Sequence, residues 1–255
     1  MTTTDITTML RRNIKSQLRY PVTIFAIIGI PVLFLLLFVY VFGGALAEAV
    51  DVSGSQDYVD YVLPGLIIMT AAAGLLGTST STSVDMTEGI ITRFRTMAIF
   101  RPSILIARVL SSVLQTLASM LFVFVVALLM GLSPNATAVE WLAIVGVLAL
   151  ISFSLSWLGL AFGLAAKTID AASNAPFPLI LMPLVGSGIV PTDSMPTVVR
   201  WFAEYQPFTP MIETLRGLLN GSEIGDSALL TFAWCLGITV LGFIWSVRAF
   251  NRDRS

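Results

Sequence analysis

Few residues of this 255-residue chain could do chemistry. Histidine is absent, and Cys235 is the single cysteine. Those two facts exclude histidine-ligated haem, histidine-based metal sites, histidine-dependent hydrolases and an intrachain disulfide. The chain also lacks a G-x-x-x-x-G-K-[ST] phosphate loop, so it cannot hydrolyse ATP by that mechanism. We therefore expect a protein that is not an enzyme, with no catalytic residue, no metal site and no cofactor bound by this chain.

Hydroxyl side chains form the most conspicuous polar run, six consecutive Thr and Ser residues at positions 78–83. Hydroxyls in a membrane span bond to carbonyls of their own helix or across to a neighbouring helix. One interpretation is therefore tight helix packing, and the alternative is the polar lining of a translocation path. The residues that the alternative would use are Thr70, Thr78, Ser79, Ser81 and Asn174.

Basic residues are distributed unequally between the loops that separate the apolar segments. Twelve of the fourteen fall on one side: Arg11, Arg12, Lys15, Arg19, Arg93, Arg95, Arg101, Arg108, Lys167, Arg248, Arg252 and Arg254. Arg200 and Arg216 fall on the other side. Loops rich in Lys and Arg stay in the cytoplasm. The pattern predicts six membrane spans with both termini cytoplasmic.

The composition agrees with a membrane protein. The chain is 56% hydrophobic and only 11% charged, with a mean hydropathy of +0.89, whereas soluble domains carry about a quarter charged residues. We predict one all-α polytopic domain over residues 1–255. Its spans, each long enough for a hydrocarbon core of about 30 Å, are placed near residues 22–42, 60–83, 104–130, 139–165, 174–190 and 228–248.

Particular segments carry more specific expectations. Residues 5–19 have an apolar stripe opposite a basic face, the pattern of an amphipathic helix on the membrane surface. Leu63-Pro64-Gly65 is taken to open the second span, and Pro176, Pro178 and Pro183 should kink or break the fifth. No span contains a convincing buried ionisable residue, which argues against a proton relay or a cation-coupled carrier.

Two loops are longer than a hairpin needs. The cytoplasmic loop 84–103 mixes apolar and charged residues, and the outer segment 191–227 is too apolar for a solvated loop. We expect the outer segment to form one or two short re-entrant helices, with Trp201 and Tyr205 at the depth of the headgroups.

Four motifs resemble the ABC-type export permeases of the type-2 family, best known from the daunorubicin-resistance permeases. Residues 88–97 read EGIITRFRTM, followed by Arg101, Pro102 and Arg108, and are similar to the family pattern EGTLDRFRSLPISR…GR. Residues 190–196, VPTDSMP, are similar to VPVETMP, and residues 206–216, QPFTPMIETLR, are similar to NPFTPVVEALR. The LPG of residues 63–65 is the fourth match. Residues 98–100, AIF in place of the usual PIS, and Gln206 in place of Asn depart from the patterns.

The resemblance implies a bacterial cytoplasmic (inner) membrane, and it implies that transport and ATP hydrolysis are carried out by different subunits. Two permeases would pair, as a homodimer or a paralogous heterodimer, and two copies of a cytoplasmic ATPase subunit would hydrolyse ATP with Mg²⁺ on that partner. A cytoplasmic coupling helix would dock in a groove of the ATPase. The candidate coupling residues are Glu88, Gly89, Ile90, Arg93, Phe94, Arg95 and Met97. The plainer alternative is that Arg93 and Arg95 only enforce topology and bind lipid headgroups.

The outer segment would then form an exit gate between the paired subunits. Its candidate residues are Pro191, Pro196, Trp201, Pro207, Phe208, Pro210, Glu213 and Arg216. The expected cargo is an amphipathic drug, a lipid or a glycan, and membrane lipids rather than nucleic acid are the other expected contacts. The competing hypotheses are a self-sufficient secondary carrier or channel, and an intramembrane enzyme. The enzyme would need a nucleophile and base, or paired acids, within the spans.

Overall fold

The computed structural model describes residues 21–43, 55–88, 101–222 and 224–251, and this part of the chain is helical without strands. The helices are α2 (Pro21–Leu36), α4 (Ser55–Thr87), α6 (Arg101–Leu129), α7 (Ala138–Ala165), α8 (Ile169–Asn174), α9 (Phe177–Val185), α10 (Thr197–Tyr205), α11 (Phe208–Asn220) and α12 (Ser227–Asn251). A π-helical segment, η1 (Leu37–Val41), continues α2, and a 3₁₀ turn, η2 (Thr192–Ser194), precedes α10. The predicted surface helix, residues 5–19, lies outside the described residues.

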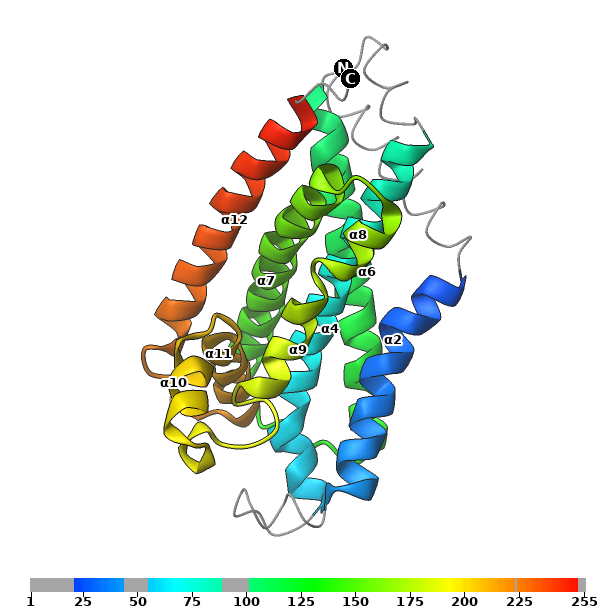
Figure 1. Ribbon diagram of the computed structural model, residues 1–255. Helices are drawn as coiled ribbons and strands as arrows, with labels where there is room; N and C mark the ends of the chain where they lie inside the picture. Colours follow the sequence, from blue (N-terminus) through cyan, green and yellow to red (C-terminus); the bar gives the residue numbers. More distant parts are fainter. Residues whose placement is uncertain (1–20, 44–54, 89–100, 223, 252–255) are drawn as a thin grey trace.

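Four of these helices are long and apolar enough to cross a membrane. The spanning stretches are Tyr58–Thr87, Leu105–Leu129, Ala138–Ala165 and Ser227–Asn251, which correspond to the second, third, fourth and sixth predicted spans. The four helices run side by side along the length of the molecule (Figure 1). Their length and composition make the chain a multi-pass membrane protein.

The first and fifth predicted spans have a different form. The first corresponds to α2 and η1, which follow one another without a gap. The fifth, placed near residues 174–190, begins at the last residue of α8 and contains the short helix α9, with the break between the two helices at Ala175 and Pro176. At 1.5 Å per residue, the nine residues of α9 cover about 14 Å, less than half the hydrocarbon thickness. The count of six spans therefore stays a prediction, and the proline-rich segment is broken as its composition indicates.

Helix α4 begins earlier than the sequence predicts. It starts at Ser55, so Pro64 lies inside the helix and does not open it. The expectation that residues 63–65 begin the second span is wrong. Proline removes one backbone hydrogen bond from a helix interior, and surrounding protein supports this part of α4, because residues 62–72 are buried. Helix α4 contacts α2, α6, α7, α8, α9 and α11, and is therefore the central helix of the bundle.

Glycines on α7 allow it to lie directly against α4. Gly159 and Gly163 are four residues apart and share one helix face. A Cβ atom on Gly159 would meet the carbonyl oxygen of Leu75, and one on Gly163 would meet the carbonyl oxygen of Ser79. Small residues at this spacing let two helix backbones approach closely. Helices α6 and α12, in contrast, expose rows of large apolar side chains, a surface suited to membrane hydrocarbon.

The two ends of the bundle carry different sets of basic residues. Helices α10 and α11, which carry Arg200 and Arg216, lie together at one end (Figure 1). At the opposite end, Met86 of α4, Leu105 of α6, Leu164 of α7 and Phe250 of α12 form one apolar cluster. Arg108, Lys167 and Arg248 therefore lie toward that end, which we call the basic end.

Candidate functional site

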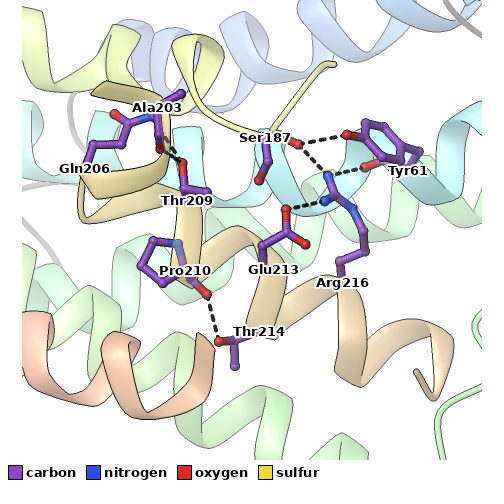
Figure 2. A network of polar contacts seen from close by, with 9 residues as sticks. All are labelled: Tyr61, Ser187, Ala203, Gln206, Thr209, Pro210, Glu213, Thr214 and Arg216. Atoms are coloured by element: carbon purple, nitrogen blue, oxygen red, sulfur yellow. Dashed lines mark hydrogen bonds and ion pairs between the residues drawn. The ribbon is translucent and has the colours of Figure 1, made fainter. Parts of the chain in front are cut away.

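A buried arginine organises the end of the bundle that holds α10 and α11. Arg216 of α11 donates from Nη1 to Oε1 of Glu213 at 2.8 Å. Its Nη2 donates to the carbonyl oxygen of Ser187 at 2.6 Å and to that of Tyr61 at 3.2 Å. The guanidinium carbon also lies 4.0 Å from the centroid of the Tyr61 ring. Figure 2 shows how these four residues, the Arg216 cluster, converge from α4, α11 and the turn after α9.

The positive charge of Arg216 is stabilised by protein groups, although its side chain is largely shielded from water. The Arg216 side chain is 13% exposed and that of Glu213 is 39% exposed. Carbonyl dipoles and the negative face of an aromatic ring supply the remaining stabilisation of the positive charge. Each partner comes from a different part of the chain. Arg216 therefore connects α11 to α4 and to the turn after α9.

The backbone beside the cluster is packed too closely for any side chain. A Cβ atom on Gly65 of α4 would lie 2.6 Å from the Cα atom of Gly188. Tyr58 adds a hydrogen bond from its hydroxyl to the carbonyl oxygen of Ile189 at 3.2 Å. The LPG residues at 63–65 thus matter through the position of Gly65, because glycine is required where two backbones approach this closely.

Local sequence explains how α11 is held. Pro207 caps the helix, where its missing N–H is not needed, and Gly221 ends it in a left-handed conformation with φ of +66°. The Thr209 hydroxyl donates to the carbonyl oxygen of Ala203. The Thr214 hydroxyl bonds to the carbonyl oxygen of Pro210 and to the hydroxyl of Thr231 on α12. Several of these contacts appear in Figure 2.

The predicted gate residues divide into two groups. Phe208 and Pro210 are buried within α11, near Glu213 and Arg216. Trp201 is exposed on α10 and its ring lies tilted beside that of Tyr205, with ring centroids 5.3 Å apart. Pro191 and Pro196 precede η2 and α10. The first group thus lies on one helix, and in the second group Pro196 and Trp201 are exposed while Pro191 is half-buried.

An exposed ion-pair network joins η2 to α10. Arg200 contacts Glu204 at 2.7 Å and Asp193 at 2.6 Å. The hydrogen bond to Glu204, together with the negative charge of Asp193, raises the pKa of the Arg200 guanidinium above its usual value. Arg200 is therefore charged throughout the physiological range. Water screens exposed pairs of this kind, so we expect a small contribution to stability.

Hydroxyls of α4 bond within the protein. Thr70 donates to the carbonyl oxygen of Leu66, and Ser81 donates to that of Gly77. Thr78, Ser112 of α6 and Ser156 of α7 form a connected line of hydroxyls. We call these three residues the hydroxyl seam. Its contacts are those expected of helix packing.

The remaining candidates for the pathway lie closer to α8. Ser79 donates to the carbonyl oxygen of Ala172 of α8 at 2.7 Å. Asn174, in contrast, is exposed at the end of α8. A role of these residues in lining a path stays a prediction.

An ion pair lies inside the apolar helices near the basic end. Nη1 of Arg108 on α6 is 2.9 Å from Oδ2 of Asp85 on α4, and the side chains are 10% and 22% exposed. The expectation that no span holds a buried ionisable residue is therefore wrong. The placement of Arg108 in a loop before the third span is also wrong, because α6 begins at Arg101. The sequence does indicate such a pair, because an acidic residue stands near the end of one span and a basic residue near the start of the next.

The candidate coupling residues fall mainly outside the described part of the chain. This applies to Gly89, Ile90, Arg93, Phe94, Arg95 and Met97. Glu88 is described, is exposed, and donates its N–H to the carbonyl oxygen of Val84 at 2.9 Å. Within residues 21–43, 55–88, 101–222 and 224–251, no group of three or more Cys, Asp or Glu side chains could hold a metal ion.

Comparison with known proteins identifies the family. The model of the ABC-2 type transporter family matches residues 4–220. The chain belongs to the ABC-2 type transporter family. It is 28% identical over 220 residues to the daunorubicin resistance ABC transporter permease protein DrrB1 of Streptomyces coeruleorubidus, covering 84% of this chain and 75% of that protein. It is 21% identical over 224 residues to the probable doxorubicin resistance ABC transporter permease protein DrrC of Mycobacterium tuberculosis, covering 86% and 78%.

Membership of the ABC-2 family confirms the resemblance drawn from the four motifs. The matched range includes α2, α4, α6 and α7, the broken segment of α8 and α9, and α10 and α11. It therefore contains both the Arg216 cluster and the Asp85–Arg108 pair. The relatives are named as ABC transporter permeases, which are transport components rather than enzymes.

Proposed function

We propose that this chain is the membrane-spanning permease subunit of an ATP-driven exporter. The observation that carries the proposal is the ABC-2 family match over residues 4–220, together with similarity to two drug-resistance permeases. Since the chain has no phosphate loop, a separate subunit would bind ATP and Mg²⁺ and hydrolyse the nucleotide. Two such ATPase subunits would act on two paired permeases, identical or paralogous.

Conformational changes of the ATPase would be transmitted to the permease through the cytoplasmic loop 84–103. The RFR sequence at residues 93–95 and the apolar residues around it suit a short helix in a groove of the partner. The basic end of the bundle, with Arg108, Lys167 and Arg248, would face the cytoplasm, because positive residues remain on that side. Both termini would then be cytoplasmic, in a bacterial inner membrane.

The Arg216 cluster would act as the closed state of the outer gate. Its contacts connect α11 with α4 and with the turn after α9, so separation of these elements must break them together. Trp201 and Tyr205 on the exposed face of α10 suit the depth of the lipid headgroups. Cargo would pass between the paired subunits, and an amphipathic drug, lipid or glycan suits walls that are apolar with few charges.

A self-sufficient carrier or channel is the alternative. The buried Asp85–Arg108 pair removes one argument against it, because a carrier needs ionisable groups within its spans. The pair lies near the ends of α4 and α6, however, whereas carriers bind their coupling ions near the middle of the bilayer. Family membership also favours the exporter.

Affinity purification of the tagged chain from its native host tests the proposal. We expect an ATPase subunit with a phosphate loop to co-purify, in amounts equal to the permease. Recovery of the chain alone, from a membrane in which it still transports, would instead support the carrier.

A further inference from the structure

A salt bridge inside apolar helices needs a reason other than stability. Removing two charges from water costs several kcal/mol per ion, and apolar residues in their place are often as stable. The Asp85–Arg108 pair is mostly shielded, and Arg108 is buried as a whole residue. Ionisable residues in membrane helices are commonly functional. We therefore expect the pair to have a role in the transport cycle.

The pair lies where four helices meet. Met86 of α4 lies next to Asp85 in sequence and packs with Leu105 and Val109 of α6. Trp157, Leu160 and Leu164 of α7 and Phe250 of α12 complete this apolar cluster. Seven residues before Asp85, or two helical turns, the hydroxyl seam connects α4 to α6 and α7. Polar contacts thus join α4 and α6 at two successive levels.

The position of the pair in the sequence suggests its role. Asp85 lies three residues before Glu88, and Arg108 lies seven residues after Arg101. Helix α4 ends at Thr87 and α6 begins at Arg101, so the pair joins the two helices that flank residues 88–100, the middle of the predicted cytoplasmic loop 84–103. We propose that Asp85 and Arg108 are positioning residues that clamp α4 to α6, so that work delivered to this loop moves α4 and does not merely separate the two helices. The inference rests on the proposed function.

Helix α4 then carries the movement to the opposite end. Tyr61, whose carbonyl oxygen and ring hold Arg216, lies 24 residues before Asp85 on the same helix. At 1.5 Å per residue the separation is about 36 Å. The close contacts at Gly159 and Gly163 of α7 support α4 between these points. A clamped α4 thus joins the loop that receives work to the cluster that closes the outer end.

The test measures cargo moved per ATP hydrolysed. The permease and its ATPase are reconstituted together in liposomes with the ATPase outside, and a fluorescent anthracycline serves as the cargo probe. Asp85→Asn and Arg108→Gln each remove the ion pair of the clamp. Energetic coupling between distant sites commonly amounts to about 5–150-fold. We therefore expect each variant to lower transport per ATP by at least about fivefold, while ATP hydrolysis by the assembled complex continues.

Arg248→Gln is the matched control. It removes a cation from an exposed position at the same end of the bundle, and transport per ATP should not change. Unchanged transport per ATP in both clamp variants would overturn the proposal. If neither neutral variant assembles, Arg108→Lys replaces them, since it keeps the charge but loses the reach and planar geometry of arginine. An assembled Arg108→Lys complex with undiminished transport per ATP then overturns the proposal, and reduced transport per ATP supports it.

Failure of the proposed function gives a different result. In that case no ATPase subunit assembles with the unmodified permease, so there is no complex whose transport depends on ATP. If only the clamp proposal is wrong, the unmodified complex transports cargo, and the two neutral variants transport as much cargo per ATP as it does.

Discussion

Replacement of Arg216 by methionine should loosen the attachment of α11 to the bundle. Methionine keeps an unbranched apolar stem but removes the charge and every donor. The variant loses a charged hydrogen bond to the carbonyl of Ser187, with a length of 2.6 Å, and the contact with the Tyr61 ring at 4.0 Å. It also loses the ion pair with Glu213.

The magnitude follows from those three contacts. A hydrogen bond to a charged group contributes about 1.5–3 kcal/mol, and a cation–π contact contributes about 0.5–2 kcal/mol. The Glu213 pair adds at most about 1 kcal/mol, because Glu213 is 39% exposed and water can solvate it once Arg216 is gone. Contributions within one cluster are not additive. We therefore take a value in the lower half of the combined range, about 3 kcal/mol.

Amide hydrogen exchange of the protein in lipid nanodiscs measures this loss directly. Local opening of α11 and of the turn after α9 should become easier by about 3 kcal/mol. Since each 1.4 kcal/mol is tenfold, amides in residues 186–190 and 208–218 should exchange about 100-fold faster. Arg200→Met, which removes the exposed ion pairs of α10, is the control and should change exchange little in these ranges. Equal exchange rates in the Arg216→Met and unmodified proteins would refute the role assigned to the cluster.

Two further predictions concern packing and orientation. Gly163→Ala should destabilise the protein by about 1–3 kcal/mol, because its Cβ meets the carbonyl of Ser79, whereas Gly146→Ala in the same helix has open space and should be neutral or stabilising. Thermal unfolding of the two variants in detergent measures the difference, and equal melting temperatures would contradict the packing argument. Single cysteines at Ser194 or Ser222, in a Cys235→Ala background, should react with an impermeant thiol reagent added outside intact cells, and a cysteine at Lys167 should react only after permeabilisation. The opposite labelling pattern would reverse the assigned orientation.

The sequence predicts well those features that depend on local composition. Apolar length located four spanning helices, and prolines located the break between α8 and α9. The start of α4 was missed because Pro64 usually marks a helix beginning, while here surrounding helices support a proline in the interior. Propensity is a weak guide where tertiary packing is this extensive.

Long-range contacts are what the sequence could not provide. The motif identifies Arg216, but Tyr61 and Ser187 are distant in the sequence, and the backbone carbonyls that accept hydrogen bonds from Arg216 leave no mark on residue type. The sequence shows the charges of Asp85 and Arg108, but it places Asp85 in a loop and counts Arg108 among the loop cations although it lies within the range of the third span. Their pairing depends on how far α4 and α6 extend, and a shift of a few residues in a helix boundary decides whether a charge is exposed or buried.

ATP-dependent transport by the purified complex tests the central claim most directly. The permease and its co-purifying ATPase are reconstituted in liposomes with the ATPase outside, and uptake of a fluorescent anthracycline is followed after ATP and Mg²⁺ are added. We expect uptake that requires both subunits and ceases with a non-hydrolysable ATP analogue. Uptake by the permease alone, driven by an ion gradient and indifferent to ATP, would contradict the assignment of this chain as an exporter subunit.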